Sequence, residues 1–277
     1  MLSMLKLLTT LLLLSSILVA NPNEEIEDFL KEQFGKNPAV SKLDVKVVDR
    51  INIESMKGWD AVVVAVEATL KEKKKSRKVK QKMIWFTDGT VITKELTDMA
   101  TSTSLRDYVT PSFKPSQYKK ENLIYGNVDA EHKVAIFSDP LCPFCRTFVP
   151  SAIKYMKKQP NKFALYYYHF PLPTIHPAAI TLSKAAIAAE LKGRKNTLLD
   201  MYTINLNPKE RDVKKILAAF NKTMHTDIKP SDLKSKEVIE HFKSDLKITE
   251  DLMVQGTPTI FFDGKIDKTK QKFKKVK

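Results

Sequence analysis

The chain has 277 residues, of which 43% are hydrophobic and 29% are charged. This is a globular composition, with material for one large domain or two ordinary ones. The formal net charge of +15 would suit a nucleic acid or a membrane surface. However, the lysines are spread along the chain without the interleaved aromatic residues of single-strand binders. We therefore expect a lysine-rich soluble protein with no nucleic-acid partner.

The first 20 residues have the pattern of a secretory signal peptide. Lys6 is the only charge among the first 23 residues, and a mainly apolar run follows it to Ala20. The run is short for a membrane span, which needs roughly 20 apolar residues, and Ala20 offers a small residue for cleavage. We expect cleavage after Ala20 and export. An uncleaved membrane anchor is the alternative.

Residues 21–110 read as a first domain, one helix on a small antiparallel sheet. Apolar side chains recur on one face of a helix over 24–36. Alternating residues predict strands over 43–54, 59–70 and 79–86. The Asp88-Gly89 pair predicts a hairpin that returns through a short strand over 90–93. Residues 111–128, in a stretch rich in Thr, Ser and Pro, are expected to be a linker with some helix near 115–123.

Residues 129–277 read as a second domain in which strands and helices alternate. Short apolar runs predict strands over 133–137, 163–170 and 259–262. Helical patterns lie over 176–192, 198–202, 209–220 and 235–251. Strands separated by helices predict a sheet with some parallel pairing, in an α+β protein.

The two cysteines, Cys142 and Cys145, form a C-x-x-C pair. A disulfide that closes so small a loop removes little entropy from the unfolded chain, so it would be a poor structural staple. A zinc site would need two more ligands, and the chain has neither a third cysteine nor histidines in H-x3-5-H spacing. The spacing therefore favours redox chemistry. An inert buried pair is the other possibility.

The pair stands where a helix should begin, directly after the strand 133–137 and its loop. Unpaired N–H groups and the helix dipole favour a negative charge at Cys142, and the thiolate is the form that attacks a disulfide. Cys145, one turn on, could then resolve the mixed disulfide. No cofactor is expected beyond a redox-active Cys142–Cys145 disulfide.

Four further residues are candidates: Pro143 and Phe144 for tuning the pair, and Thr257 and Pro258 for docking the substrate. Pro143 suits the first helical turn, and Phe144 could contact the substrate or act only as a spacer. Pro258 follows Thr257 just before the strand 259–262. A cis proline there would leave the preceding backbone free to bind an extended peptide. An ordinary turn proline is the alternative.

The segments Phe137-Ser-Asp-Pro-Leu-Cys142-Pro-Phe-Cys145 and Thr257-Pro258 together resemble the Dsb family of periplasmic thiol–disulfide oxidoreductases. The resemblance is closest to the DsbC/DsbG disulfide isomerase branch. It implies a C-terminal thioredoxin fold with an inserted helical region. It also implies an N-terminal cystatin/NTF2-like dimerisation domain, because Phe86-Thr-Asp-Gly-Thr is similar to the hairpin of that domain. The implied partners are exported protein substrates, a second copy of the chain, and a membrane thiol reductant of the DsbD type.

Three functions stay open on these grounds. The first is a homodimeric disulfide isomerase or reductase, which the separate N-terminal domain and Thr257 favour. The second is a DsbA-like oxidase that donates disulfides, and the third is a non-catalytic chaperone. His169 and His176, which flank a proline-rich loop, are expected to be structural. Asp139 is expected to cap its loop, and the basic residues 268–277 to be solvated.

Overall fold

The computed structural model describes residues 22–72, 75–194 and 197–276. The chain divides into two compact units, Met1–Lys94 and Glu95–Lys277. The division lies earlier than the boundary at residue 110 that the sequence suggested. The signal peptide predicted for residues 1–20 lies outside the described residues. In the described part of the chain, no helix combines the length and the apolar character that crossing a membrane requires.

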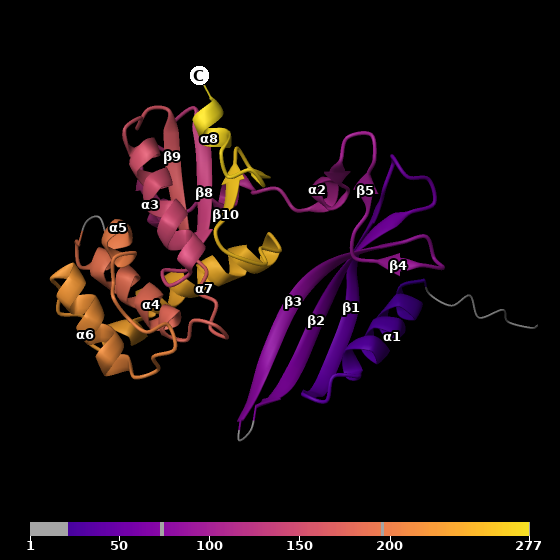
Figure 1. The fold of residues 1–277 in the computed structure, drawn as a ribbon, viewed down its shortest axis with the longest axis horizontal. Coiled ribbons are helices and arrows are strands. Elements are labelled where there is room, and N and C mark those ends of the chain that lie inside the picture. Colours follow the sequence, from indigo (N-terminus) through magenta and orange to yellow (C-terminus); the bar gives the residue numbers. More distant parts are fainter. Residues whose placement is uncertain (1–21, 73–74, 195–196, 277) are drawn as a thin grey trace, which may run out of the picture. The chain divides into compact units, whose positions relative to one another are not determined.

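The N-terminal unit is a helix on a four-stranded antiparallel sheet (Figure 1). Its elements are α1 (Pro22–Gly35), β1 (Val40–Asn52), β2 (Asp60–Glu72), β3 (Lys75–Thr87) and β4 (Ile92–Thr93), with the strands in chain order across the sheet. Ile26 and Leu30 of α1 pack against Val45, Val62 and Val64 of the sheet. The alternation read from the sequence thus corresponds to the face covered by the helix.

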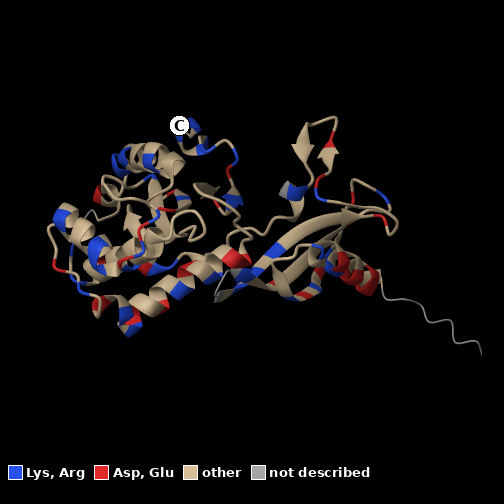
Figure 2. Cartoon of the chain, turned by 60° about the horizontal axis from the view of Figure 1, so that its bottom comes forward, with Lys and Arg blue, Asp and Glu red and all other residues tan. Residues whose placement is uncertain are grey.

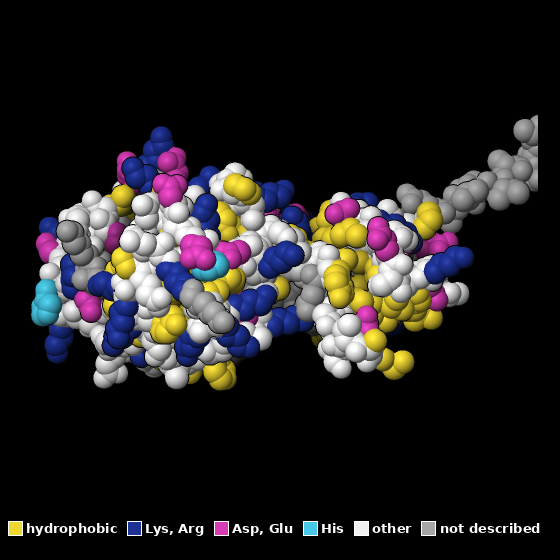
Figure 3. Space-filling view, turned by 90° about the horizontal axis from the view of Figure 1, so that it is seen from above, with side chains coloured by type: hydrophobic (Ala, Val, Ile, Leu, Met, Phe, Trp, Pro, Cys, Tyr) yellow, Lys and Arg dark blue, Asp and Glu magenta, His cyan; other side chains and the backbone are white. Residues whose placement is uncertain are grey.

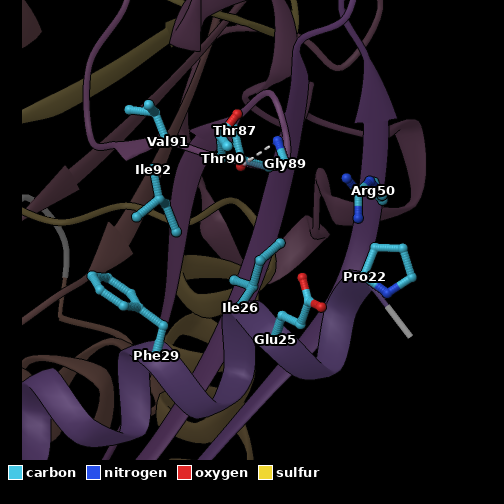
Figure 4. Close-up of a pocket in the computed structure, with 10 residues that line it drawn as sticks. All are labelled: Pro22, Glu25, Ile26, Phe29, Arg50, Thr87, Gly89, Thr90, Val91 and Ile92. Carbon is cyan, nitrogen blue, oxygen red and sulfur yellow. Dashed lines mark hydrogen bonds between the residues drawn. The ribbon is translucent and has the colours of Figure 1, made fainter. Parts of the chain in front are cut away.

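The turn between β3 and β4 has the chemistry expected of its Asp-Gly pair. Asp88 Oδ1 accepts hydrogen bonds from the backbone N–H groups of Thr90 and Val91, at 2.9 and 2.8 Å. Gly89 has a φ of 93°, which favours glycine. Beside this turn lies a cavity of about 390 Å³ that α1 and the turn line together (Figure 4). The cavity lies in the N-terminal unit, whereas both cysteines belong to the other unit.

The C-terminal unit begins with a small hairpin, β5 (Thr97–Asp98) and β6 (Thr103–Ser104), and the short helix α2 (Arg106–Val109). The stretch expected to be a linker packs into this unit. Phe113 is buried, and its N–H donates to Gly264 O at 2.7 Å. Two 3-10 turns, Pro115–Gln117 and Lys120–Asn122, lead into β7 (Leu123–Tyr125), which pairs with β9. The aromatic contacts of Phe113 and the pairing of β7 with β9 explain why residues 111–128 pack into the unit, although their local sequence is typical of a loop.

The main sheet of this unit has five strands in the order β11-β10-β8-β9-β7. They are β8 (His132–Ser138), β9 (Phe163–His169), β10 (Thr259–Phe262) and β11 (Lys265–Ile266), with β7 at the edge. Strands β8 and β9 are parallel, and the remaining pairs are antiparallel. The parallel pair requires a crossover, and the helix that begins after Cys142 supplies it.

Helices cover this sheet and extend beyond it (Figure 1). They are α3 (Pro143–Lys157), α4 (Ala178–Leu191), α5 (Thr197–Met201), α6 (Val213–Met224), α7 (Lys236–Asp251) and α8 (Lys272–Lys275), with a 3-10 turn at Asp232–Lys234. Between β9 and β10 the chain inserts α4 to α7. The alanines of α4 are buried in the main core together with both cysteines, so their small side chains permit close helix packing.

Basic side chains occur on both units (Figure 2). On the face seen in Figure 3, Lys and Arg are scattered among other side chains.

Candidate active site

Cys142 is the N-cap of α3. Its backbone is extended (φ −68°, ψ 123°), and its carbonyl accepts the first helical hydrogen bond, from Arg146 N at 3.0 Å. Pro143 occupies the first helical position, where its missing N–H costs nothing. The Cys142 thiol therefore stands at the positive end of a 15-residue helix. It is 5% exposed, and it donates to Thr257 O at 3.6 Å.

Cys145 lies one turn further along α3 and is fully buried. Both cysteines are free thiols in this structure. Burial raises the pKa of the Cys145 thiol to about 12, while the hydroxyls of Ser138 and Thr257 and the Asp139 backbone act in the opposite direction. The two thiols therefore differ: Cys142 stands at the helix end next to an accepting carbonyl, and Cys145 is held protonated behind it.

The Thr257–Pro258 peptide bond is cis, and this loop lies directly against the cysteine pair through the contact of Cys142 with Thr257 O. Pro258 is buried. The Thr257 hydroxyl is also buried, and it lowers the pKa of the Cys145 thiol against the effect of burial. The fold thus brings together two sequence segments more than 100 residues apart.

Phe144 is 75% exposed, although it lies between the buried Cys142 and Cys145. An exposed aromatic ring on the first turn of α3, next to exposed Pro143, forms an apolar surface beside the cysteines. Neither residue ionises, so both act on the site through shape and apolar contact.

Asp139 caps the loop before the cysteines, as the sequence suggested, and it also ties that loop to a second one. Its carboxylate is fully buried and accepts from Leu141 N at 2.7 Å and Leu172 N at 2.8 Å. His176 Nδ1 lies 3.0 Å from the same carboxylate. The proline-rich loop and the cysteine loop are therefore held together by one buried acid.

Arg146 follows the pair, and the direction of its side chain could not be read from the sequence. It donates from Nε to Pro140 O at 3.0 Å and from Nη2 to Ile204 O at 2.7 Å. The guanidinium thus braces the cysteine loop against the segment after α5.

A chain of three hydroxyls in the core around Cys145 was not predicted from the sequence. Ser138 Oγ lies 2.7 Å from Tyr202 Oη, which lies 2.8 Å from Tyr167 Oη. All three side chains are buried. Buried tyrosines usually find a hydrogen-bond partner, which is the one available signal, but the partners come from three distant segments.

A second buried polar cluster lies at the end of β9. Asp245 of α7 accepts from Asn122 Nδ2 at 2.7 Å and from His169 N at 2.9 Å. Burial raises the pKa of Asp245 to about 8 and lowers that of His169 to about 3. His241, 3.8 Å from Asp245, also has a pKa lowered by burial. In the ranges that the structure describes, no group of three or more His, Cys, Asp or Glu residues is arranged to hold a metal ion.

A mixed five-stranded sheet, a C-x-x-C pair at the start of a crossover helix and a cis-proline loop against that pair define a thioredoxin-fold domain. The family model described as thioredoxin matches residues 118–277. The chain therefore belongs to the thioredoxin family.

The fold is similar to several solved structures. A thioredoxin-like oxidoreductase from Silicibacter pomeroyi DSS-3 is 19% identical, with a TM-score of 0.45 over 55% of this chain and 87% of that chain. ScsC from Proteus mirabilis in a transitional conformation is 23% identical, with a TM-score of 0.44 over 55% and 68%. Oxidised BdbD from Bacillus subtilis is 19% identical, with a TM-score of 0.47 over 60% and 92%. A comparison with curated proteins gives no match.

Proposed function

We propose that this protein exchanges thiols and disulfides with exported proteins in the periplasm, as a disulfide isomerase or reductase. The observation that carries the proposal is the difference between its two thiols. Cys142 caps a helix beside the Thr257 carbonyl, whereas Cys145 is fully buried with its pKa raised to about 12. This asymmetry gives Cys142 the role of attacking thiol and Cys145 that of resolving thiol.

The reaction begins when the Cys142 thiolate attacks one sulfur of a substrate disulfide. A Cys142–substrate bond forms, the substrate S–S bond breaks, and the second substrate sulfur leaves as a thiolate. In isomerisation, a substrate thiolate then attacks the mixed disulfide and releases Cys142. In reduction, Cys145 attacks Cys142 instead, the substrate leaves as a thiol, and a Cys142–Cys145 disulfide forms.

The remaining parts of the proposal concern location and partners. The apolar start of the sequence supports export to the periplasm. The separate N-terminal unit, with its helix-covered sheet, supports a role in pairing two copies of the chain. A membrane thiol reductant of the DsbD type would return the Cys142–Cys145 disulfide to the dithiol form.

Reactivation of scrambled ribonuclease, with reduction of insulin disulfides as a second assay, tests the proposal. We expect the wild type to be active in both assays and Cys142→Ser to be inactive. Cys145→Ser should accumulate a mixed disulfide that gel electrophoresis without reductant detects. Equal recovery with Cys142→Ser would contradict the proposal and favour a chaperone.

Two further measurements separate the proposal from an oxidase. Alkylation trapping in cells should find Cys142 and Cys145 mainly reduced, whereas fully oxidised cysteines would favour a donor of disulfides. The mass in solution should be that of a dimer, and a monomer would remove the support for the isomerase architecture.

A further inference from the structure

The resolving thiol poses a chemical problem that the proposed function leaves unanswered. Cys145 must become a thiolate to attack the mixed disulfide, yet its sulfur is fully buried and burial disfavours the charged form. A buried anion needs hydrogen-bond donors that point at it. Two hydroxyls, those of Ser138 and Thr257, lower the pKa of this thiol against the effect of burial.

The Ser138 hydroxyl is backed by two phenols. Ser138 ends β8, Tyr167 lies on the neighbouring strand β9, and Tyr202 follows α5. The O···O distances are 2.7 Å from Ser138 to Tyr202 and 2.8 Å from Tyr202 to Tyr167. Both tyrosines belong to the same buried core as the cysteines. Burial raises the pKa of both phenols, so each keeps its hydrogen at neutral pH.

Each hydroxyl has one hydrogen to donate, so the direction of the chain matters. If Tyr167 donates to Tyr202 and Tyr202 to Ser138, the Ser138 hydrogen is left to point at Cys145. In the reverse order Ser138 donates its hydrogen to Tyr202, so the Cys145 sulfur has no donor from Ser138. A phenol is a stronger acid, hence a stronger donor, than an alcohol, so the pair of tyrosines favours the first direction. Hydrogen bonds in such chains also strengthen one another.

We propose that the hydroxyl chain Ser138–Tyr202–Tyr167 activates the resolving thiol, with the two tyrosines as positioning residues that hold the Ser138 hydroxyl as a donor to the Cys145 sulfur. The inference rests on the proposed function. In the step concerned, the Cys145 sulfur bonds to Cys142 Sγ and the bond between Cys142 and the substrate sulfur breaks. That sulfur leaves with the bonding electron pair and takes up the proton that Cys145 gives up.

The test follows the two thiols of the full-length protein separately with an aromatic disulfide, 5,5′-dithiobis(2-nitrobenzoate). Attack by Cys142 releases one nitrothiobenzoate, and attack by Cys145 on the resulting mixed disulfide releases a second. Both phases are recorded by stopped flow from pH 6 to 10. The variants are Tyr202→Phe, Tyr167→Phe and Ser138→Ala.

Tyr168→Phe is the matched control. It lies next to Tyr167 on β9, and its hydroxyl donates to Gln117 O at 2.6 Å. Its side chain packs in the second core cluster of the unit, separate from the one that holds the cysteines. The variant therefore removes one tyrosine hydroxyl and its hydrogen bond from the same strand, and it leaves the hydroxyl chain Ser138–Tyr202–Tyr167 intact.

We expect the second phase to slow by about threefold to tenfold in Tyr202→Phe and Tyr167→Phe, less than for loss of a whole hydrogen bond to a charged group. Its pH midpoint should rise, Ser138→Ala should show the largest change, and the first phase should stay as in the wild type. A second phase unchanged in both tyrosine variants, or slowed as much by Tyr168→Phe, would overturn the inference. Failure of the proposed function looks different, because the wild type would then reduce no protein disulfide at all.

Discussion

At the residue scale, the site depends on adjacent residues with opposite environments. Cys142 and Cys145 are buried, while Phe144 between them is 75% exposed. The first turn of α3 produces this contrast, since successive residues in a helix are turned about 100° from one another. The chain thus presents an apolar ring beside its reactive sulfur without exposing the resolving one.

Replacing Phe144 by alanine should weaken substrate binding without harming the fold. The ring touches solvent more than protein, so the free energy of unfolding should change by no more than about 0.5 kcal/mol. Loss of apolar contact should raise KM for a protein disulfide by about threefold to tenfold, with kcat unchanged. Insulin reduction at varied substrate concentration measures both constants.

Thr147→Ala is a suitable control, because Thr147 is exposed one turn further along α3. A KM for Phe144→Ala equal to that of the wild type would show that Phe144 is a spacer, the alternative left open by the sequence.

At the scale of helices and strands, local patterns predicted most of the fold. The alternation of Val62, Val64 and Val66 and the Asp88-Gly89 pair located the N-terminal sheet and its turn. In the C-terminal unit, apolar runs and turn residues located β8, β9 and β10. The residues of each of these elements favour the structure that the element adopts, so local sequence patterns are enough to predict it.

The elements that were missed are held by distant partners. Strand β7 is three residues long and forms because β9 pairs with it. In the site, the cysteines were identifiable from their spacing. In contrast, the bond of Asp139 with His176 and the contact of Ser138 with Tyr202 join loops whose proximity only the tertiary fold creates.

Helix α7 carries a buried acid that should make stability depend on pH. The folded-state pKa of Asp245 is raised to about 8, above the ordinary value for an unfolded chain. Its stabilising contribution is therefore complete at low pH and is lost as the pH rises through 8. His169, with a pKa lowered to about 3, acts in the opposite sense and only below about pH 6.5, so it adds nothing to the pH dependence above pH 7.

Between pH 7 and 9 we expect Asp245 to lower the free energy of unfolding by about 1 to 2 kcal/mol. Asp245→Asn should remove this contribution from the slope of the free energy of unfolding against pH. The amide accepts only one of the two hydrogen bonds now made by Asn122 and His169, but this cost does not vary with pH. Asp251→Asn on the same helix, whose carboxylate pairs with Lys247 at 2.6 Å, should keep the wild-type slope. Urea unfolding at several pH values measures the slopes, and identical slopes for wild type and Asp245→Asn would contradict the assignment.

At the scale of the whole molecule, the two units differ in what each contains. The N-terminal unit has its own core around Leu30 and its own sheet. The C-terminal unit contains both cysteines, the cis-proline loop and the hydroxyl chain. It also includes residues 111–128, which were expected to be a linker.

Truncation tests where the thioredoxin-fold unit begins. A fragment of residues 95–277 should unfold cooperatively, because it keeps Phe113, Asn122 and β7. A fragment of residues 129–277 should not, since it lacks the edge strand and an aromatic ring that packs against Phe137, Tyr168 and Phe261. Removing a buried Phe side chain alone costs about 3 to 5 kcal/mol, a large part of the stability of an ordinary domain.

The full-length chain separates this packing effect from the effect of cutting the chain. Phe113→Ala should lower the free energy of unfolding of the C-terminal unit by about 3 kcal/mol or more. Tyr108→Ala, a few residues earlier and 67% exposed, should change it by no more than about 0.5 kcal/mol. If residues 129–277 unfolded as cooperatively as residues 95–277, the segment would be a linker after all, and Phe113 would then also tolerate alanine. The expected opposite result would mean that the segment before residue 129 is part of the sheet and core that support Cys142 and Cys145.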